Sequence, residues 1–232
     1  DDIQIIMQGS EERRKFIDQC LSQLDKDYLN RLILYNQILE QRNALLRSSD
    51  DKNPPDFELM NVYDAQLLEP ALYIHKKRIE FVEMLKPIFE SIYSVISGDR
   101  EKVDLQYSSQ LFDNDMEILL FESRRKDVIL QRTTKGIHKD DLELYIKEQP
   151  LKKYASQGQL KSYLLALKLA EYEVLRQYGG ISPLLLLDDI FDKLDAGRVA
   201  FLLKLLMGKQ FGQVFITDTY ESRISDILNA IN

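Results

Sequence analysis

The chain has 232 residues, and its 31 Lys and Arg against 38 Asp and Glu give a formal net charge of −7. That charge excludes a globally basic nucleic-acid-binding protein, so any contact with DNA has to come from local basic clusters. The single cysteine excludes an internal disulfide and favours a reducing compartment, and no run approaches the roughly 20 apolar residues needed to cross a bilayer.

The first hundred residues predict a helical arm. Apolar residues recur at helical spacing in SEERRKFIDQCLSQL, where Ser10 is the expected N-cap and Cys20 a small core residue, and again in DYLNRLILYNQILEQRNALLR. After a break at SSDDKNPPD, a third helical stretch runs from Phe57 to about Ser97, and Pro70 and Pro87 are expected to kink or split it. The opening DDIQIIMQGS lacks an initiator methionine, so we expect the sequence to be a fragment of a longer protein.

After Gly98 the pattern changes to alternating strands and helices. A strand is expected at KVDLQYSS, a helix over QLFDNDMEILLFESRRKDVILQRT and a strand at DDLELYIKE. The remaining expected elements are a helix from Ser156 to about Tyr178, a strand Leu184–Asp188, a helix Ala196–Met207, a strand Gln213–Thr217 and a helix Glu221–Asn229. This alternation predicts a mixed α/β fold with a parallel sheet, so we expect a helical arm over residues 1–97 and an α/β domain over residues 98–232.

Two acids directly follow an apolar strand in PLLLLDDIFDKLD. The four leucines are typical of a strand buried on both faces, and ligands bind at the carboxyl ends of such strands. Asp188 could hold Mg²⁺, which prefers oxygen ligands and keeps several waters, while Asp189 could orient or deprotonate an attacking water. The alternative is a strand that ends in solvated acids and holds no ligand.

A second candidate site lies upstream, in YASQGQLKSYLLALKLAE. Ser156, Gly158 and Gln159 lie where a strongly apolar helix begins, and the free N–H groups of a helix start bind phosphate. Ser156 could equally be a simple N-cap, with Gly158 and Gln159 in the first turn.

Together these stretches resemble the ATP-binding-cassette ATPases. In the resemblance, ASQGQ corresponds to the signature motif, LLLLDD to the Walker B strand and Leu194–Asp195 to the D-loop. The resemblance implies that Asp188 is the magnesium ligand and Asp189 the catalytic carboxylate. It places Asp218 at the switch position, where many cassettes have a histidine, with Thr217 and Thr219 beside it.

Five motifs narrow the resemblance to the RecF family of bacterial DNA replication and repair proteins. They occur in order over essentially the whole chain: GSEERRKFIDQCLSQL, YNQILEQRNALL, GIHKDDLEL, ASQGQLKSYLLALKLAE and LLLLDDIFDKLD. Ile137 and Lys139 depart from the family's third motif. The phosphate-binding sequence GxxxxGK[ST] is absent from the 232 residues, and the resemblance places it in an amino-terminal lobe. We therefore expect half of an ATP site here, without activity on its own.

The resemblance implies that two subunits sandwich two ATP molecules with Mg²⁺. Ser156, Gly158 and Gln159 would contact the γ-phosphate of the partner's ATP, and Asp195 would cross the interface. The homodimer would be an ATP-dependent clamp on duplex DNA or single-strand/double-strand junctions, acting at gaps and stalled replication forks. It would work with RecO and RecR in DNA repair, recombination and the SOS response, in the bacterial cytoplasm near the nucleoid.

Candidate contacts to DNA phosphates fall in three basic clusters: Arg13, Arg14 and Lys15; Lys76, Lys77 and Arg78; Arg124, Arg125 and Lys126. Each cluster could instead be a solvated helix face or a set of salt-bridge partners. His138 and Asp140 could be functional or structural. Arg42 and Asn43 could touch DNA or pin the arm against the α/β domain.

Three other functions are weighed against this one. A cassette ATPase of the SMC or Rad50 kind would insert a very long coiled coil, for which this chain has no room. A transporter nucleotide-binding domain would need a smaller helical insertion than these hundred residues. A helical scaffold without ATP chemistry would have no need of the acids Asp188 and Asp189.

Overall fold

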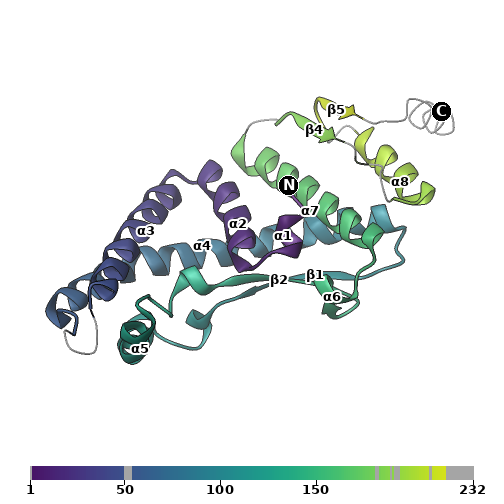
Figure 1. Cartoon of the computed structure of the whole chain (residues 1–232). Coiled ribbons are helices and arrows are strands. Elements are labelled where there is room, and N and C mark those ends of the chain that lie inside the picture. Colours follow the sequence, from purple (N-terminus) through teal and green to yellow (C-terminus); the bar gives the residue numbers. More distant parts are fainter. Residues whose placement is uncertain are drawn as a thin grey trace. The chain divides into compact units, whose positions relative to one another are not determined.

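A computed structural model describes residues 2–49, 54–180, 183–188, 190, 194–208 and 211–217 (Figure 1). The chain forms two compact units. The helical unit comprises Gly9–Val82 and Tyr107–Leu142, and the sheet unit comprises Asp1–Gln8, Glu83–Gln106 and Glu143–Asn232. This division differs from the expected boundary at residue 97. Residues 107–142 belong to the same unit as residues 9–82, with which they form hydrogen bonds.

The helical unit holds α2 (Ser10–Leu24), α3 (Lys26–Arg47), the first part of α4 (Phe57–Ser97), η1 (Gln110–Phe112), α5 (Met116–Leu130) and η2 (Ile137–Lys139). The expected N-cap at Ser10 is wrong, because Ser10 is already the first helical residue and Gly9 occupies the cap position. Asp25 caps α3 by accepting a hydrogen bond from the Tyr28 backbone N–H at 3.0 Å. Such caps satisfy N–H groups that a helix start leaves without partners. Cys20 is fully buried, as expected.

The helix α4 is continuous over 41 residues, so of the two effects expected of Pro70 and Pro87, a kink or a split, the split is wrong. A proline inside a helix removes one N–H donor from the ladder of hydrogen bonds. Side chains on both sides of each proline are fully buried, among them Leu67, Phe81 and Phe89. We infer that the buried apolar face of α4 outweighs the loss of one hydrogen bond at each proline.

The sheet unit holds α1 (Gln4–Met7), residues 83–97 of α4, α6 (Leu151–Tyr154), α7 (Gln157–Gly179) and α8 (Ala196–Leu206). One sheet has the strand order β1 (Val103–Ser108), β2 (Asp141–Ile146) and β3 (Gln149–Pro150). Its strands β2 and β3 are antiparallel. The core of the unit includes the rings of Phe89, Tyr93 and Tyr163, with the Phe89 and Tyr163 centroids 4.7 Å apart. No described helix is long and apolar enough to span a membrane.

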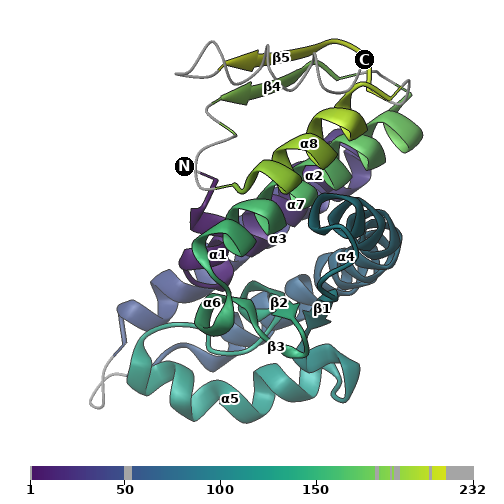
Figure 2. The same cartoon turned by 90° about the vertical axis from the view of Figure 1, so that its right-hand side faces the viewer.

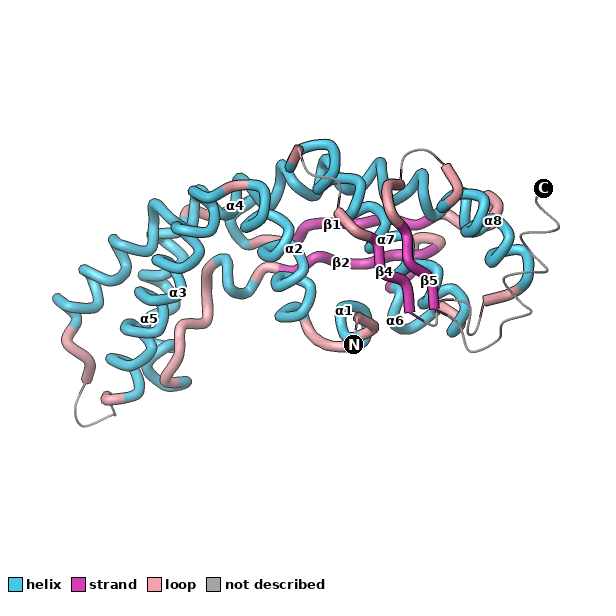
Figure 3. The backbone as a smooth tube through the Cα atoms, turned by 90° about the horizontal axis from the view of Figure 1, so that it is seen from above, coloured by secondary structure: helices cyan, strands magenta, loops and turns pink. Residues whose placement is uncertain are grey.

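A second sheet pairs β4 (Leu185–Asp188) with β5 (Val214–Thr217) in parallel, as the alternating pattern predicts (Figure 3). Figures 1 and 2 draw α7 and α8 on the same side of this sheet. The expectation that the strand is buried on both faces is wrong for the described part of the chain. Leu185 and Leu187 are buried, whereas Leu184 and Leu186 are 61% and 72% exposed, because described elements cover only one face. The expected helix Glu221–Asn229 lies outside the described residues.

Candidate functional site

The carboxyl ends of β4 and β5 bring two predicted site residues together. Asp188 and Thr217 are the last residues of the two parallel strands, and they are paired in register. The Thr217 hydroxyl donates a hydrogen bond to the Asp188 carboxylate, and both residues are exposed. Ligand sites form at this edge of parallel sheets. The other predicted members at this edge, Asp189 and Asp218, lie outside the described residues.

The oxygen atoms at this edge fit Mg²⁺. Magnesium is usually held by one or two carboxylates and retains several waters, so the exposed Asp188 carboxylate is a suitable ligand. The Thr217 hydroxyl fixes the orientation of that carboxylate. Within the described ranges, no three or more His, Cys, Asp or Glu side chains gather into a metal cage. The donor set therefore suits a cation that is also bound by phosphate and water.

The start of α7 has the geometry of a capping box. Ser156 is the N-cap: its hydroxyl accepts a hydrogen bond from the Gln159 backbone N–H at 3.3 Å, and the Gln159 side-chain oxygen accepts one from the Ser156 N–H at 2.7 Å. Gln157 and Gly158 form the first turn, where N–H groups precede the hydrogen-bond ladder of the helix. The N-cap interpretation of Ser156 is thus confirmed. An N-cap at Ser156 is compatible with phosphate binding at the start of α7, because the positive end of the helix dipole lies at this position.

Glu101 links the start of α7 to α8. Its carboxylate accepts hydrogen bonds from the Tyr93 hydroxyl at 2.6 Å, the Gln159 side-chain amide at 2.8 Å and the Arg198 guanidinium at 3.0 Å. Burial raises the pKa of Glu101, but the hydrogen bonds from Tyr93, Gln159 and Arg198 outweigh it and leave the pKa below its ordinary value. Glu101 is therefore held as a carboxylate.

Asp195 joins the same network at the start of α8. Its side chain caps the helix by accepting a hydrogen bond from the Arg198 N–H at 2.9 Å, and it accepts a second one from the Arg198 side chain at 3.2 Å. The backbone hydrogen bond from Arg198 is the main reason that the pKa of Asp195 is lowered, although burial opposes it. Arg198 also donates to the Ser162 hydroxyl at 2.9 Å. One continuous set of polar contacts thus connects Gln159 with Asp195.

Glu101 and Arg198 were not predicted as site residues from the sequence. Arg198 follows Asp195 at a spacing of three residues in a helix, which is a weak signal for a capping pair. Glu101 lies 58 residues from Gln159 and 97 residues from Arg198, and no local pattern predicts such partners.

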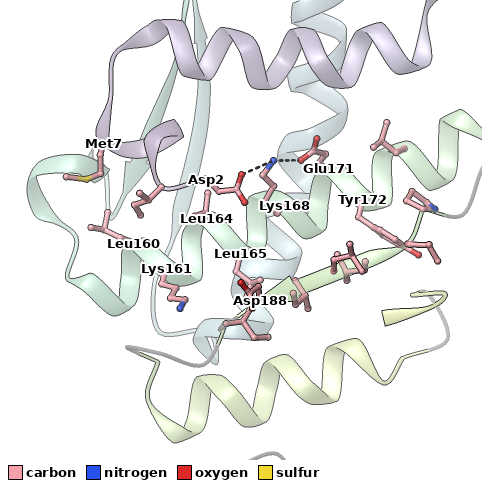
Figure 4. Close-up of a pocket in the computed structure, with 18 of the residues that line it drawn as sticks. Asp2, Met7, Leu160, Lys161, Leu164, Leu165, Lys168, Glu171, Tyr172 and Asp188 are labelled. Atoms are coloured by element: carbon pink, nitrogen blue, oxygen red, sulfur yellow. Dashed lines mark hydrogen bonds and ion pairs between the residues drawn. The ribbon is translucent and has the colours of Figure 1, made fainter. Parts of the chain in front are cut away.

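An open cavity of about 860 Å³ lies between α1, α7 and β4, with Asp188 in its lining (Figure 4). Leucines from α7 and β4 form much of the lining, so the cavity itself is a poor phosphate site. At one wall Lys168 forms ion pairs with Asp2 at 3.7 Å and Glu171 at 3.0 Å. Among the lining residues, Asp188 therefore carries the chemistry expected of a nucleotide site.

Four predicted DNA-contacting arginines are engaged inside the helical unit. Arg13 pairs with Asp141 through two hydrogen bonds of 2.7 and 2.8 Å, and Arg14 donates to the Asp140 carbonyl at 2.6 Å. Arg124 binds Asp64 and Asn61, both at 2.6 Å. Arg78 is 2% exposed and bonds to Asp18 at 3.0 Å and to the Ile137 carbonyl at 2.9 Å. A DNA contact from Arg78 conflicts with this burial.

The remaining basic candidates are more accessible. Lys76 is 76% exposed in its side chain and lies 3.9 Å from Glu80. Lys77 is near Asp25 and Glu80, and Lys15 pairs with Glu11 and Glu12. Arg125 and Lys126 are exposed on α5. A contact with DNA phosphates stays a prediction for these residues.

Arg42 and Asn43 hold the helical unit together. Arg42 is fully buried and bonds to Asp64 at 2.6 Å and to Asp127 and Thr133 at 2.8 Å. The Asn43 side chain accepts hydrogen bonds from the N–H and hydroxyl of Thr133, at 2.7 and 2.8 Å. All these partners belong to the same unit. Arg42 therefore joins α3 to α4, α5 and the loop after α5, and Asn43 joins α3 to the same loop.

His138 and Asp140 both make polar contacts inside this unit. The His138 Nε2 lies 3.1 Å from the Thr133 carbonyl, so it carries the proton, and Nδ1 accepts from the Tyr35 hydroxyl at 2.8 Å. Asp140 accepts from the Tyr107 hydroxyl at 2.5 Å. Burial raises the pKa of Asp140. These contacts favour the structural role that the sequence left open for both residues.

We expect the neutral form of His138 to stabilise the fold, with a defined pH dependence. Burial lowers the pKa of His138 to about 4, so the folded protein contains the neutral ring. The contribution of His138 to stability is therefore fully present above the ordinary pKa of histidine, near 6.5. That stabilisation decreases as pH falls toward 4, and the loss between pH 7 and pH 5 should be about 2 kcal/mol. Urea unfolding of the wild type and His138→Gln at both pH values measures it. The difference between the two proteins should shrink at pH 5; an equal difference at both values contradicts the prediction.

Comparisons with known proteins agree with the motifs. No protein-family model matches the chain. Over 231 residues it is 47% identical to the DNA replication and repair protein RecF of Phocaeicola vulgatus, covering 99% of this chain and 62% of that protein. It is 46% identical over 229 residues to RecF of Flavobacterium johnsoniae, covering 99% of this chain and 64% of that protein.

Solved structures show the same relationship. The recombination mediator protein RecF-ATP in the RecFOR pathway has a TM-score of 0.81 at 32% identity, over 95% of this chain and 60% of that one. The Smc head domain of Pyrococcus furiosus has a TM-score of 0.52 at 16% identity, over 98% of this chain and 55% of that one, which shows a shared fold alone.

The fold is that of the C-terminal part of an ATP-binding-cassette ATPase, a mixed α/β architecture with a parallel sheet and a helical arm. Within that class the chain matches proteins named RecF over nearly its whole length. It spans 62% and 64% of the length of the two curated relatives.

Proposed function

We propose that this chain is the part of a RecF-like DNA-repair ATPase that carries the signature, Walker B and D-loop segments. The observation that carries the proposal is the Asp188–Thr217 pair at the carboxyl edge of two parallel strands. The relatives named DNA replication and repair protein RecF, and the solved relative described as RecF-ATP, support DNA and ATP as the ligands.

In this proposal, Asp188 ligates Mg²⁺ and Asp189 orients the attacking water. When bound, the cation offsets the charge of the phosphates. Thr217 holds the Asp188 carboxylate in position, with Asp218 beside it. Ser156, Gly158 and Gln159 contact the γ-phosphate of an ATP bound to a second subunit. The phosphate-binding loop comes from sequence outside these 232 residues, since they contain no GxxxxGK[ST].

ATP then joins two subunits into a homodimer that encloses DNA, and hydrolysis releases it. Lys76, Arg125 and Lys126 are accessible basic residues that would meet phosphates. The solved relative's place in the RecFOR pathway supports RecO and RecR as partners. We place this activity at gaps and stalled replication forks in the bacterial cytoplasm. An SMC-like cassette is the second candidate, supported by the shared fold.

The decisive experiment uses the complete protein, including a phosphate-binding loop. Asp189→Asn should abolish ATP turnover and trap an ATP-bound dimer, because the amide cannot serve as the base. Light scattering with and without ATP measures the dimer, and phosphate release measures turnover. Asp113→Asn, an exposed aspartate of the helical unit, is the matched control. Unchanged turnover and no ATP-dependent dimer in Asp189→Asn would favour a non-catalytic scaffold.

A further inference from the structure

The outer face of α5 carries a stripe of four exposed residues, of which the proposed function uses only Arg125. Ile118 and Ile129 are 55% and 68% exposed, and Glu122 and Arg125 between them are exposed as well. At about 100° per residue these four positions fall within about 60° of one another around the helix. The opposite face of α5, including Leu120, is buried in the helical unit. In Figure 2, α5 is the helix drawn lowest in the picture.

The stripe reads the same from both ends, except that its central charges are opposite. The order is Ile118, Glu122, Arg125, Ile129, with spacings of four, three and four residues. A two-fold axis between positions 123 and 124 would bring Ile118 opposite the second copy's Ile129, and Glu122 opposite its Arg125. Each contact occurs twice in such an arrangement, which is the self-complementarity that an isologous interface requires.

We propose that α5 is a self-association surface, on which a second copy of this chain docks its own α5 in antiparallel orientation. Two isoleucine contacts and two ion pairs form the centre. Phe121 widens the apolar area on one side of the stripe. This residue is 66% exposed, and the Arg124 guanidinium carbon lies 5.0 Å from the centroid of its ring. No ion pair joins Glu122 or Arg125 to another described residue, so both charges are available to a partner.

A second copy fits this stripe better than DNA does. The stripe is neutral overall, its ends are apolar, and Glu122 would repel phosphate next to Arg125. Two helix faces of 15 residues bury less area than the standard interface of about 1,200–2,000 Å². We therefore expect weak association in solution. The fraction of paired chains should rise when several chains are bound to one DNA molecule, because their effective concentration is then higher.

Charge reversal tests the pairing without nucleotide. In sedimentation equilibrium of the whole chain up to about 1 mM, Glu122→Arg and Arg125→Glu should each weaken self-association by about tenfold or more. The double variant should restore it, and so should an equal mixture of the two single variants, because each pairing is then between opposite charges. Glu40→Arg, an exposed glutamate in the middle of α3, is the matched control and should have no effect.

Cysteine cross-linking tests the antiparallel orientation. Ile118→Cys mixed with Ile129→Cys should form disulfide-linked dimers, whereas either variant alone should not. In the antiparallel pair the two copies of position 118 are about 16 Å apart at 1.5 Å per residue, too far for a disulfide. The native Cys20 is fully buried and does not interfere.

The outcomes separate the alternatives. Restoration by the mixture together with selective cross-linking supports the proposal. A wild type that stays monomeric at all concentrations, equal association of wild type and Glu122→Arg, or cross-linking of each cysteine variant with itself overturns it. Loss of DNA binding in Arg125→Glu with unchanged self-association also overturns it and assigns the residue to DNA. None of these results depends on ATP, so the proposed ATPase function is tested separately.

Discussion

Arg42→Met is expected to lower the free energy of unfolding by about 3–5 kcal/mol, the usual cost of breaking a buried ion pair from one side. Arg42 is fully buried and neutralises Asp64 and Asp127, which lie 2.6 and 2.8 Å from its guanidinium. Asp64 would keep its second partner, Arg124. Asp127 is also fully buried and would keep hydrogen bonds to Ser123 and Thr134 but no cation within 4 Å among the described residues.

Urea unfolding followed by circular dichroism measures this loss. Arg47→Met, on the exposed surface of the same helix, should change the free energy of unfolding by less than about 0.5 kcal/mol. Arg42→Lys should rescue only part of the loss, because a single ammonium group cannot reproduce the planar fork that reaches Asp64, Asp127 and Thr133. A loss for Arg42→Met no larger than for Arg47→Met would show that the network does not stabilise the unit.

The sequence predicts the helices and strands of this fold better than the contacts between residues far apart in the chain. Helical periodicity locates α2, α3 and α7, and the leucine run with its acids locates β4, because these signals are local. The burial of Arg42 depends on Asp127, 85 residues away, so the sequence alone left its role open between DNA and the α/β domain. Arg78 shows the same limit, since a basic run looks solvated until Asp18 and the Ile137 carbonyl are placed around it.

The sequence likewise predicts only part of the candidate site. The order of the strands predicts that Asp188 and Thr217 share an edge, and their pairing in register agrees. The exposure of Leu186 was not predicted, because a run of leucines indicates an apolar environment without saying which chain segments provide it. Glu101 carries no motif at all, and only the folded chain shows its position between Gln159 and Arg198.

Arg198→Met is expected to destabilise the sheet unit by about 2–4 kcal/mol, somewhat less than a fully unpaired buried charge because Glu101 keeps two donors. Arg198 and Glu101 are only 7% and 9% exposed in their side chains and lie 3.0 Å apart. The remaining donors to Glu101 are the Tyr93 hydroxyl and the Gln159 amide. Thermal and urea unfolding measure the loss, with the exposed Lys204→Met on the same helix as the control.

The pH dependence of that loss distinguishes the ion pair from simple packing. The pKa of Glu101 lies below its ordinary value of 4.5, so its charge stabilises the wild type above that pH and the contribution decreases as pH falls. The difference between wild type and Arg198→Met should therefore narrow below about pH 4.5, where Glu101 in the variant becomes protonated. Lost packing alone would give the same difference at every pH.

Removing both charges separates the effect of the ion pair on stability from its role in positioning the starts of α7 and α8. Glu101→Gln combined with Arg198→Met should recover part of the stability lost in Arg198→Met, because no buried charge is left without a partner. The double variant still lacks the polar path from Gln159 through Glu101 and Arg198 to Asp195. In the complete protein we therefore expect it to be stable yet impaired in ATP-dependent dimerisation. A double variant that is stable and dimerises normally would restrict Arg198 to a role in stability.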